Sequence, residues 1–272
     1  MKKITLEELI SILEKNPQKH GARLNNIRNI GNPRLALTEV QAYYKENGAL
    51  IIYQKMIHGG ISFYVENLSV TDYGYLKDLV DFNLNNTKYC AIVSAYKNAV
   101  TNKIFVDLFG DKQIEYSYQY GLFKEPNNIK KASKYEIRLL NVNDKAQISN
   151  IQENSRHYGI SLQYIFDNYI FKKSSNDIVY GCFVDKVLIA YLHVNTFDKK
   201  YWDVGFVFTN EEYRGRGIAT ELVRHYAKDI WEKGAFASYG EPINETSKYV
   251  AENVGFEKFN ETYSAILKEK FF

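Results

Sequence analysis

The stretch RGRGIA, residues 214–219, has residue types and a spacing that suit the binding of an anion. It precedes a helical pattern whose apolar face carries Leu222, Val223 and Tyr226. The first turn of a helix leaves backbone N–H groups without intrahelical partners, and the helix dipole adds partial positive charge there. Glycine lets a ligand come close to those amides, and the two arginines add charge beside them. The stretch therefore predicts a phosphate-binding site at the N-terminus of a packed helix.

Other interpretations of this stretch fit less well. A dinucleotide-binding fingerprint needs glycine at position 220, where the chain has Thr220, and a nucleotide P-loop needs Gly-Lys followed by Ser or Thr. A solvated turn that binds no ligand stays open as an alternative. That alternative gives no reason for the turn to join a strand to a firmly packed helix.

Composition limits the class of protein. The chain has 272 residues, of which 45% are apolar and 25% charged, which is typical of a globular protein with room for two ordinary domains. The net charge of +3 is spread along the chain, so we expect no nucleic-acid partner. Its apolar runs are too short for a signal peptide or a membrane span, so we expect a cytoplasmic protein without a membrane partner.

Cysteine and histidine usage argues against a metal centre. Cys90 and Cys182 lie in separate apolar, strand-like runs, which favours two buried thiols in a reduced compartment, with a disulfide or redox pair as the open alternative. None of the five histidines stands at ligand spacing from a cysteine or from another histidine. We therefore expect no metal.

Helical and strand-like patterns alternate along the chain, with a polar linker expected at 125–134. The first half predicts helices at 5–15, 38–47, 72–84 and 99–109, a hairpin within 49–65, and strands at 88–95 and 113–122. Thr5 with Glu8 forms a capping box for the first helix, and Thr71 is the expected cap of the third.

The second half predicts a strand at 135–140, a short helix capped by Asn143 or Asp144, and a helix capped by Ser161. Strands at 177–184, 187–196, 201–209, 235–240 and 257–267 follow, with helices after the RGRGIA stretch and at 245–254. This order predicts an α/β (α+β) fold with a mixed, mostly antiparallel central sheet flanked by helices. We expect two domains, at 1–130 and 131–272.

Two motifs together resemble those of the GNAT superfamily of acyl-CoA N-acyltransferases. RGRGIA is similar to its acyl-CoA signature, Q/R-x-x-G-x-G/A, and residues 244–256, NETSKYVAENVGF, are similar to its second motif, a helix with Asn-x-x-Ser/Ala that ends in Gly-Phe. The resemblance covers about residues 134–272, in the expected order of elements. It implies a GNAT fold and the use of acetyl-CoA as co-substrate.

The resemblance also implies positions for the parts of acetyl-CoA. The pyrophosphate would lie on the amides of 215–220, and the pantetheine arm would pair with the backbone of 207–209, at a V-shaped gap between the strands 201–209 and 235–240. A backbone N–H of the strand 201–209 would then form the oxyanion hole. The expected cofactor-binding residues are Val207, Phe208, Thr209, Arg214, Gly215, Arg216, Gly217, Ile218, Ala219, Thr220, Asn244 and Ser247.

Acyl transfer to an amine needs a general base near the mouth of this gap. Glu241, at the end of one strand, is the first candidate, Asp203 the second and His193 a third, with a solvated or paired side chain as the alternative for each.

Many family members carry a tyrosine seven residues after the motif asparagine, as the acid for the leaving thiolate. This chain has Ala251 there, and Tyr249 is expected to face elsewhere on the helix. Tyr263 or Ser247 serves instead, or water does, or the step needs no acid. A subset related to glycine N-acyltransferases also lacks the tyrosine and has serine at the position of Ser247, so this subset is the nearest resemblance.

The two halves of the chain share a spacing of elements. The helices expected at 72 and 219 start 147 residues apart, and the strands expected at 89 and 235 start 146 apart. A duplication would leave such spacing, so we expect a degenerate GNAT-like domain in the first half. It lacks the arginine–glycine turn and should not bind coenzyme A. It would instead wall the acceptor pocket or support dimerisation.

Together these observations predict an acetyl-CoA-dependent N-acetyltransferase. The expected acceptor is a primary amine of a small molecule or amino acid, which attacks directly with the help of a general base. A protein N-acetyltransferase and a non-catalytic protein that binds or senses acyl-CoA are the open alternatives. A homodimer also stays open.

Overall fold

The computed structural model describes residues 1–28, 30–31, 37–56, 59–84, 87, 89–94, 103, 105–107, 114–127, 135–151, 156–157, 160–161, 177–196, 200–240, 242 and 244–269. The chain forms two compact units, of which the first comprises Met1–Tyr118 with Asn260–Phe272 and the second Gln119–Phe259. This division differs from the expected boundary at 130/131, because the last strand of the chain belongs mainly to the first unit.

The sheet of the first unit has the order β1-β2-β3-β4-β5-β14. All described pairs are antiparallel except β4 with β5, which run parallel and are joined by a helix. The strands are β1 (Lys2–Ile4), β2 (Leu37–Tyr44), β3 (Leu50–Met56), β4 (Gly60–Glu66), β5 (Tyr89–Ser94) and β14 (Glu257–Glu269).

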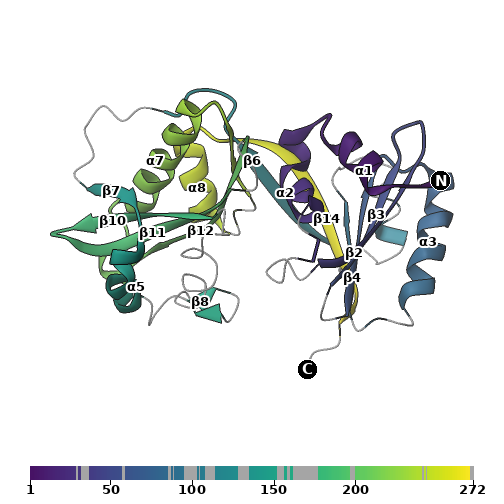
Figure 1. The fold of residues 1–272 in the computed structure, drawn as a ribbon, viewed down its shortest axis with the longest axis horizontal. Helices are drawn as coiled ribbons and strands as arrows, with labels where there is room; N and C mark the ends of the chain where they lie inside the picture. The colour runs from purple at the N-terminus through teal and green to yellow at the C-terminus, as the bar shows by residue number, and fades with distance from the viewer. Residues whose placement is uncertain are drawn as a thin grey trace. The chain divides into compact units, whose positions relative to one another are not determined.

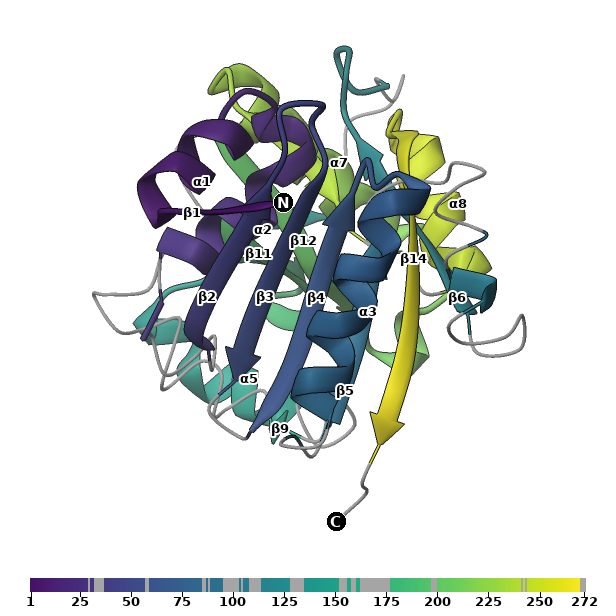
Figure 2. The ribbon, with the colours of Figure 1, turned by 90° about the vertical axis from the view of Figure 1, so that its right-hand side faces the viewer.

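Helices cover both faces of this sheet, as Figure 2 shows for α3 (Val70–Leu84) lying along β4. Alternate residues of a strand point to opposite faces, so Ile51 packs with Leu76 of α3 while Ile52 packs with Leu9 of α1. The second face is covered by α1 (Leu6–Leu13) and α2 (Pro17–Arg28).

The sheet of the second unit has the order β6-β13-β12-β11-β10-β7. Its one parallel pair is β12 with β13, and the other described pairs are antiparallel. The strands are β6 (Ile114–Gly121), β7 (Glu136–Leu139), β10 (Ile178–Val184), β11 (Val187–Thr196), β12 (Tyr201–Thr209) and β13 (Phe236–Tyr239), and β8 (Arg156–His157) and β9 (Ile160–Ser161) pair separately.

Helices α7 (Ile218–Glu232) and α8 (Glu245–Val254) lie on one side of β10–β12, and α5 (Lys145–Ile151) lies on the other (Figure 1). The apolar side of α7 is fully buried at Leu222, Val223, Tyr226 and Ile230, whereas Trp231 is 40% exposed. On the α5 side, Ile148 packs with a cluster that includes Tyr191, Phe206 and Phe208. The anchored α7 is what positions its N-terminus.

The two units repeat one plan. Each has an edge strand, three antiparallel strands, a helix and a fourth strand parallel to the third, in the same sheet order. Each sheet also has a strand that follows the other unit's elements in the sequence. In the first unit β14 pairs with β5, and in the second unit β6 pairs with β13. The expected tandem arrangement of two GNAT-like domains is therefore confirmed.

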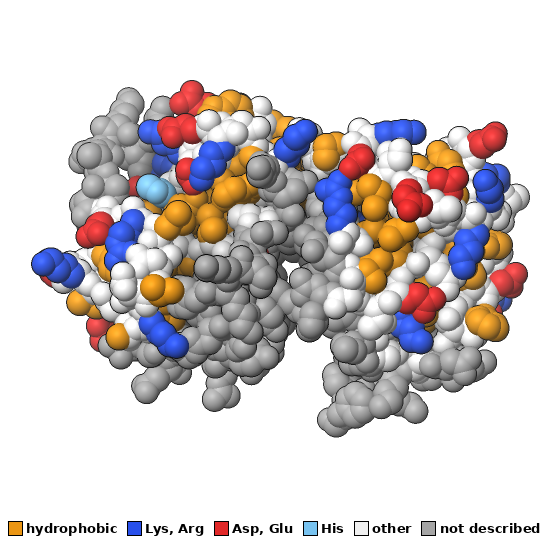
Figure 3. All heavy atoms as spheres, viewed as in Figure 1, with side chains coloured by type: hydrophobic (Ala, Val, Ile, Leu, Met, Phe, Trp, Pro, Cys, Tyr) orange, Lys and Arg blue, Asp and Glu red, His pale blue; other side chains and the backbone are white. Residues whose placement is uncertain are grey.

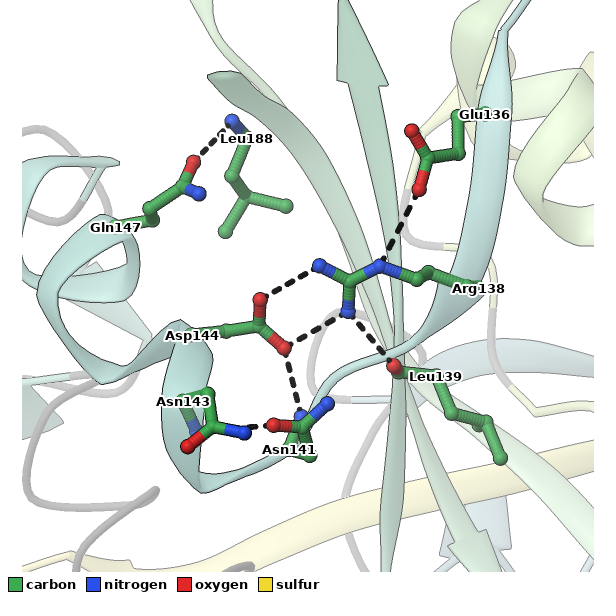
Figure 4. Close-up of polar contacts among 8 residues, drawn as sticks. All are labelled: Glu136, Arg138, Leu139, Asn141, Asn143, Asp144, Gln147 and Leu188. Atoms are coloured by element: carbon green, nitrogen blue, oxygen red, sulfur yellow. Dashed lines mark hydrogen bonds and ion pairs between the residues drawn. The ribbon is translucent and has the colours of Figure 1, made fainter. Parts of the chain in front are cut away.

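A capping box follows the edge strand in each unit. Thr5 and Glu8 exchange side-chain and backbone hydrogen bonds at the start of α1. Asn141 and Asp144 do the same at the 3₁₀ turn η2 (Val142–Asp144), and Arg138 of β7 holds the Asp144 carboxylate with two hydrogen bonds, of 2.7 and 2.9 Å (Figure 4). The cap is therefore Asn141, whereas Asn143 or Asp144 was expected.

Several expected elements differ from the structure. The segment predicted as a helix at 38–47 is strand β2, because pairing with β1 and β3 outweighs local helix propensity. Helix α2 was not expected, although Pro17 suits a first helical position. Helix α3 begins at Val70, ahead of the expected cap Thr71. The predicted helix after Ser161 lies outside the described residues. So do most residues of the predicted helix 99–109 and of the predicted linker 125–134.

Acidic and basic side chains are interspersed over the described surface in Figure 3. Within the described part of the chain, no helix is both long enough and apolar enough to cross a membrane.

Candidate functional site

The RGRGIA turn presents an open helix N-terminus. Gly215 and Gly217 have φ of +75° and +77°, a region that favours glycine, and nothing lies within 4 Å of where a Cβ would stand on either. Gly217 is the N-cap of α7 and makes no side-chain capping bond. The first-turn amides of Ile218, Ala219 and Thr220 are thus presented to a ligand.

The two arginines of the turn are held by the turn itself. Arg214 Nε donates to the Thr209 carbonyl at 3.1 Å, and its Nη1 lies 3.0 Å from the exposed Glu211 carboxylate. Arg216 Nη2 donates to the Glu212 carbonyl at 2.9 Å, and its guanidinium lies over the Tyr213 ring. The arrangement keeps two positive charges beside the helix N-terminus, where they favour an anion.

A pocket of about 570 Å³ joins this helix end to β12, β13 and α8. Apart from Arg216, every predicted cofactor-binding residue lines it. Its lining is Val207, Phe208, Thr209, Tyr213, Arg214, Gly215, Gly217, Ile218, Ala219, Thr220, Tyr239, Asn244, Thr246, Ser247, Tyr249 and Val250.

Strands β12 and β13 part inside this unit. Their described pairs run in parallel from Tyr201 with Phe236 to Val204 with Tyr239, and β12 then continues past the last pair to Thr209. The Tyr226 hydroxyl lies 2.7 Å from the Trp202 carbonyl oxygen and 3.2 Å from that of Ser238, so α7 holds both strands just before they part. Among the described residues, no strand pairs with 207–209 on this side, where the V-shaped gap was expected.

A β-bulge coincides with the parting. The pairing of β11 with β12 passes from Val194 with Val204 to His193 with Phe206, which leaves Gly205 as the extra residue. A Cβ at Gly205 would stand 2.3 Å from His193 Nδ1, so a side chain does not fit there. A bulge bends its strand and strengthens its twist, which carries β12 away from β13.

The N-terminus of α8 closes the other side of the pocket. Asn244 is its N-cap, and its Oδ1 accepts a hydrogen bond from the Ser247 N–H at 2.8 Å. Asn244 thus has a capping role that the motif comparison did not include.

The candidate bases fall in different places. Glu241 lies outside the described residues. Asp203 pairs with Ser238, one residue before the strands part, and a Cβ at Gly240 would stand 3.2 Å from its carboxylate. Because neighbouring residues alternate, Asp203 lies on the sheet face opposite to Val204 and Tyr239. Burial raises the pKa of Tyr201 and Tyr226, and the Asp203 charge raises both further.

His193 is the third candidate base. It is buried, stacks on Phe206, and its Nε2 lies 3.1 Å from Asp177 Oδ2. It does not line the pocket. Its packing against Gly205 makes it a determinant of the bulge, and no contact of it reaches the described pocket.

The candidates for an acid are also separated. Tyr263 is fully buried in the core of the first unit beside Phe105, so it is not part of this pocket. Ala251 is fully buried. Tyr249, expected to face elsewhere, lines the pocket and is 66% exposed, because α8 presents positions 246, 247, 249 and 250 to it.

Sequence reasoning missed Tyr213, Tyr239, Thr246 and Val250. The last two follow from helical spacing once Asn244 and Ser247 are placed on α8. Tyr239 could have been predicted as a pocket residue, because it lies near the end of a predicted strand beside the expected gap.

The first unit differs at each corresponding point. β4 and β5 pair from Gly60 with Tyr89 to Val65 with Ser94, one residue short of the end of β4, so these strands stay paired over their described residues. At the N-terminus of α3, the carboxylate of Asp72 accepts hydrogen bonds from Ser69, and Lys45 Nζ lies 3.1 Å from it. The N-terminus of α3 therefore holds a carboxylate, whereas the N-terminus of α7 presents open amides.

The whole chain has the fold of GNAT structures. An acetyltransferase from the GNAT family of Colwellia psychrerythraea superposes with a TM-score of 0.61 at 13% identity, covering 98% of this chain and 99% of that chain. A GCN5-related N-acetyltransferase from Kribbella flavida gives 0.61 at 8% identity, covering 92% and 93%. A tandem GNAT protein from the clavulanic acid biosynthesis pathway gives 0.59 at 10% identity, covering 98% and 96%. None of the curated proteins matches the sequence.

The fold and the site define the class: the second unit is a GNAT-fold domain with an open helix N-terminus at a pair of parting strands. Residues 145–256 match the model of the acetyltransferase (GNAT) family. The chain therefore carries a domain of that family, whose chemistry is acyl transfer from coenzyme A. Closeness to the glycine N-acyltransferase subset stays a prediction.

Proposed function

We propose that this chain is an N-acetyltransferase that moves an acetyl group from acetyl-CoA to the primary amine of a small molecule or amino acid. The observation that carries the proposal is one pocket that connects the open amides of α7 to the parting of β12 and β13. Anion binding and an unpaired strand edge are the two things that a phosphopantetheine thioester needs from a protein.

The residues divide the work as follows. The amides of Ile218 to Thr220, with Arg214, bind the pyrophosphate. The unpaired edge of 207–209 binds the amides of the pantetheine arm. A backbone N–H of β12 near the bulge stabilises negative charge on the thioester carbonyl oxygen as the amine attacks.

Asp203 is the base that we assign among the described residues. It lies next to the last pair of β12 and β13, on the face opposite to Tyr239 and the pocket. An amine approaching from that face would meet the carbonyl carbon from the side away from the coenzyme. Asp203 would accept its proton, a contribution of ~10²–10⁴-fold in rate.

A second candidate is a protein that binds acyl-CoA without transferring the acyl group. The buried Ala251 favours it, because this helix position offers no hydroxyl to the leaving thiolate.

The test follows thiol release from acetyl-CoA in the presence of small amines, free amino acids and peptides with a free N-terminus or lysine. Mass spectrometry identifies the acetylated product. We expect release with one class of small amine. Release only with peptides would favour a protein N-acetyltransferase, and saturable binding without release from any acceptor would favour the non-catalytic protein.

A further inference from the structure

Tyr239 is a pocket tyrosine that the motifs do not assign. It is the last residue of β13 and pairs with Val204 at the point where β12 and β13 part. Its side chain lines the pocket and is 7% exposed. Of the three tyrosines that line the pocket, it is the one on a strand at the parting.

Packing and burial constrain Tyr239. Its ring makes an edge contact with Phe256, with centroids 6.0 Å apart. Burial raises the pKa of Tyr239 to about 12, so the hydroxyl stays protonated at neutral pH and remains a donor.

We propose that the Tyr239 hydroxyl donates a hydrogen bond to the thioester sulfur as the carbon–sulfur bond breaks. The inference rests on the proposed function, because it takes the thioester to lie where the strands part. It gives this chain a donor for the leaving group that does not come from position 251.

The step balances without proton transfer from the tyrosine. The amine nitrogen forms a bond to the carbonyl carbon, the carbon–sulfur bond breaks, and its electron pair stays on sulfur. The proton lost by the amine goes to the base. The thiolate leaves as an anion that the neutral Tyr239 hydroxyl stabilises, and a hydrogen bond to a charged group is stronger than one to a neutral group.

The other pocket tyrosines are placed differently. Tyr249 is 66% exposed on α8, and Tyr213 lies under Arg216 in the turn before α7. Tyr249 therefore serves as a matched control, since Tyr249→Phe removes the same atom from the same pocket.

The test measures the pKa of the thiol of free coenzyme A bound to the protein, from the ultraviolet absorbance of the thiolate against pH. We expect the bound thiol to have a pKa about one to two units lower in the unaltered protein than in Tyr239→Phe. Tyr249→Phe should match the unaltered protein. In turnover, Tyr239→Phe should lower kcat by about 10- to 100-fold.

The outcomes separate this inference from the proposed function. Failure of coenzyme A to bind the unaltered protein would overturn the proposed function, and this inference with it. If coenzyme A binds equally to all variants and its thiol pKa does not differ between the unaltered protein and Tyr239→Phe, the inference is wrong and the proposed function stands. A lower kcat in Tyr239→Phe without a change in thiol pKa would assign the tyrosine a packing role and also contradict it.

Discussion

Val204 and Tyr239 form the last described pair between β12 and β13, and β12 runs on past this pair to Thr209. The Gly205 bulge follows this pair directly, and the open N-terminus of α7 lies beyond the free edge. The geometry of the site thus depends on a backbone irregularity as much as on its side chains.

Gly205→Ala should destabilise the protein. The new Cβ would stand 2.3 Å from His193 Nδ1 and 3.0 Å from Asn195 Nδ2, and both lie on the same strand. We expect a loss of ~1–3 kcal/mol in the free energy of unfolding, measured by denaturant titration. Gly74→Ala in α3 is the control, since it meets nothing within 4 Å and should be neutral or stabilising. Equal stability of both variants would mean that the bulge tolerates a side chain.

Asp203→Asn should lower kcat by ~10²–10⁴-fold, because an amide cannot accept the proton of the attacking amine. The Kd for acetyl-CoA should not change, since Asp203 does not line the pocket. Steady-state kinetics of Asp203→Asn and Glu241→Gln side by side would distinguish the two predicted bases. Full activity of Asp203→Asn with loss in Glu241→Gln would transfer the role to Glu241.

Asp144→Asn should make stability depend less on pH. Hydrogen bonds from Arg138 hold the pKa of Asp144 below its usual value. The carboxylate therefore stabilises the fold above the unfolded-state pKa, near 3.9, and this stabilisation is lost as the pH falls through the lower folded-state pKa. We expect the variant to lose ~1–2 kcal/mol at pH 7, and less as the pH falls through the folded-state pKa of Asp144.

Glu136→Gln is the control for this ion pair, because Glu136 is an exposed second partner of Arg138 at 3.4 Å. Its effect should stay within ~0.5 kcal/mol at either pH. The difference in the free energy of unfolding between Asp144→Asn and the unaltered protein should shrink at low pH. A difference that stays as large at low pH as at pH 7 would mean that the charge of Asp144 does not stabilise the fold.

The chain should bind one molecule of coenzyme A. In the first unit β4 and β5 stay paired, and the carboxylate of Asp72 lies at the N-terminus of α3. Native mass spectrometry at increasing coenzyme A concentration should therefore show a single bound ligand per chain. A second specific ligand would contradict the degenerate state of that unit.

The sequence predicted the elements of the site well because local signals define them. Glycines at positive φ and the amphipathic α7 can be recognised without tertiary information, and so can the second motif. The spacing of elements also predicted the repeat. Strand β2 was mistaken for a helix, because its partners β1 and β3 decide its state.

Other features depend on contacts between distant parts of the chain. The bulge at Gly205 packs against His193 on a neighbouring strand, and the place of Tyr239 depends on the pairing of β13 with β12. The assignment of β14 to the first unit has no local signal either, since its sequence would suit a strand in any sheet.

Calorimetric titration of acetyl-CoA into three proteins would test whether the RGRGIA turn binds the phosphates. The three proteins are the unaltered chain, Gly217→Glu, and Gly234→Glu, which puts the same charge at a glycine of similar φ, +67°, just beyond the other end of α7. We predict a Kd in the micromolar range for the unaltered chain and for Gly234→Glu, and binding weaker by about a hundredfold, or ~2.7 kcal/mol, for Gly217→Glu. Equal affinity of all three proteins, or no binding by the unaltered chain, would contradict the account.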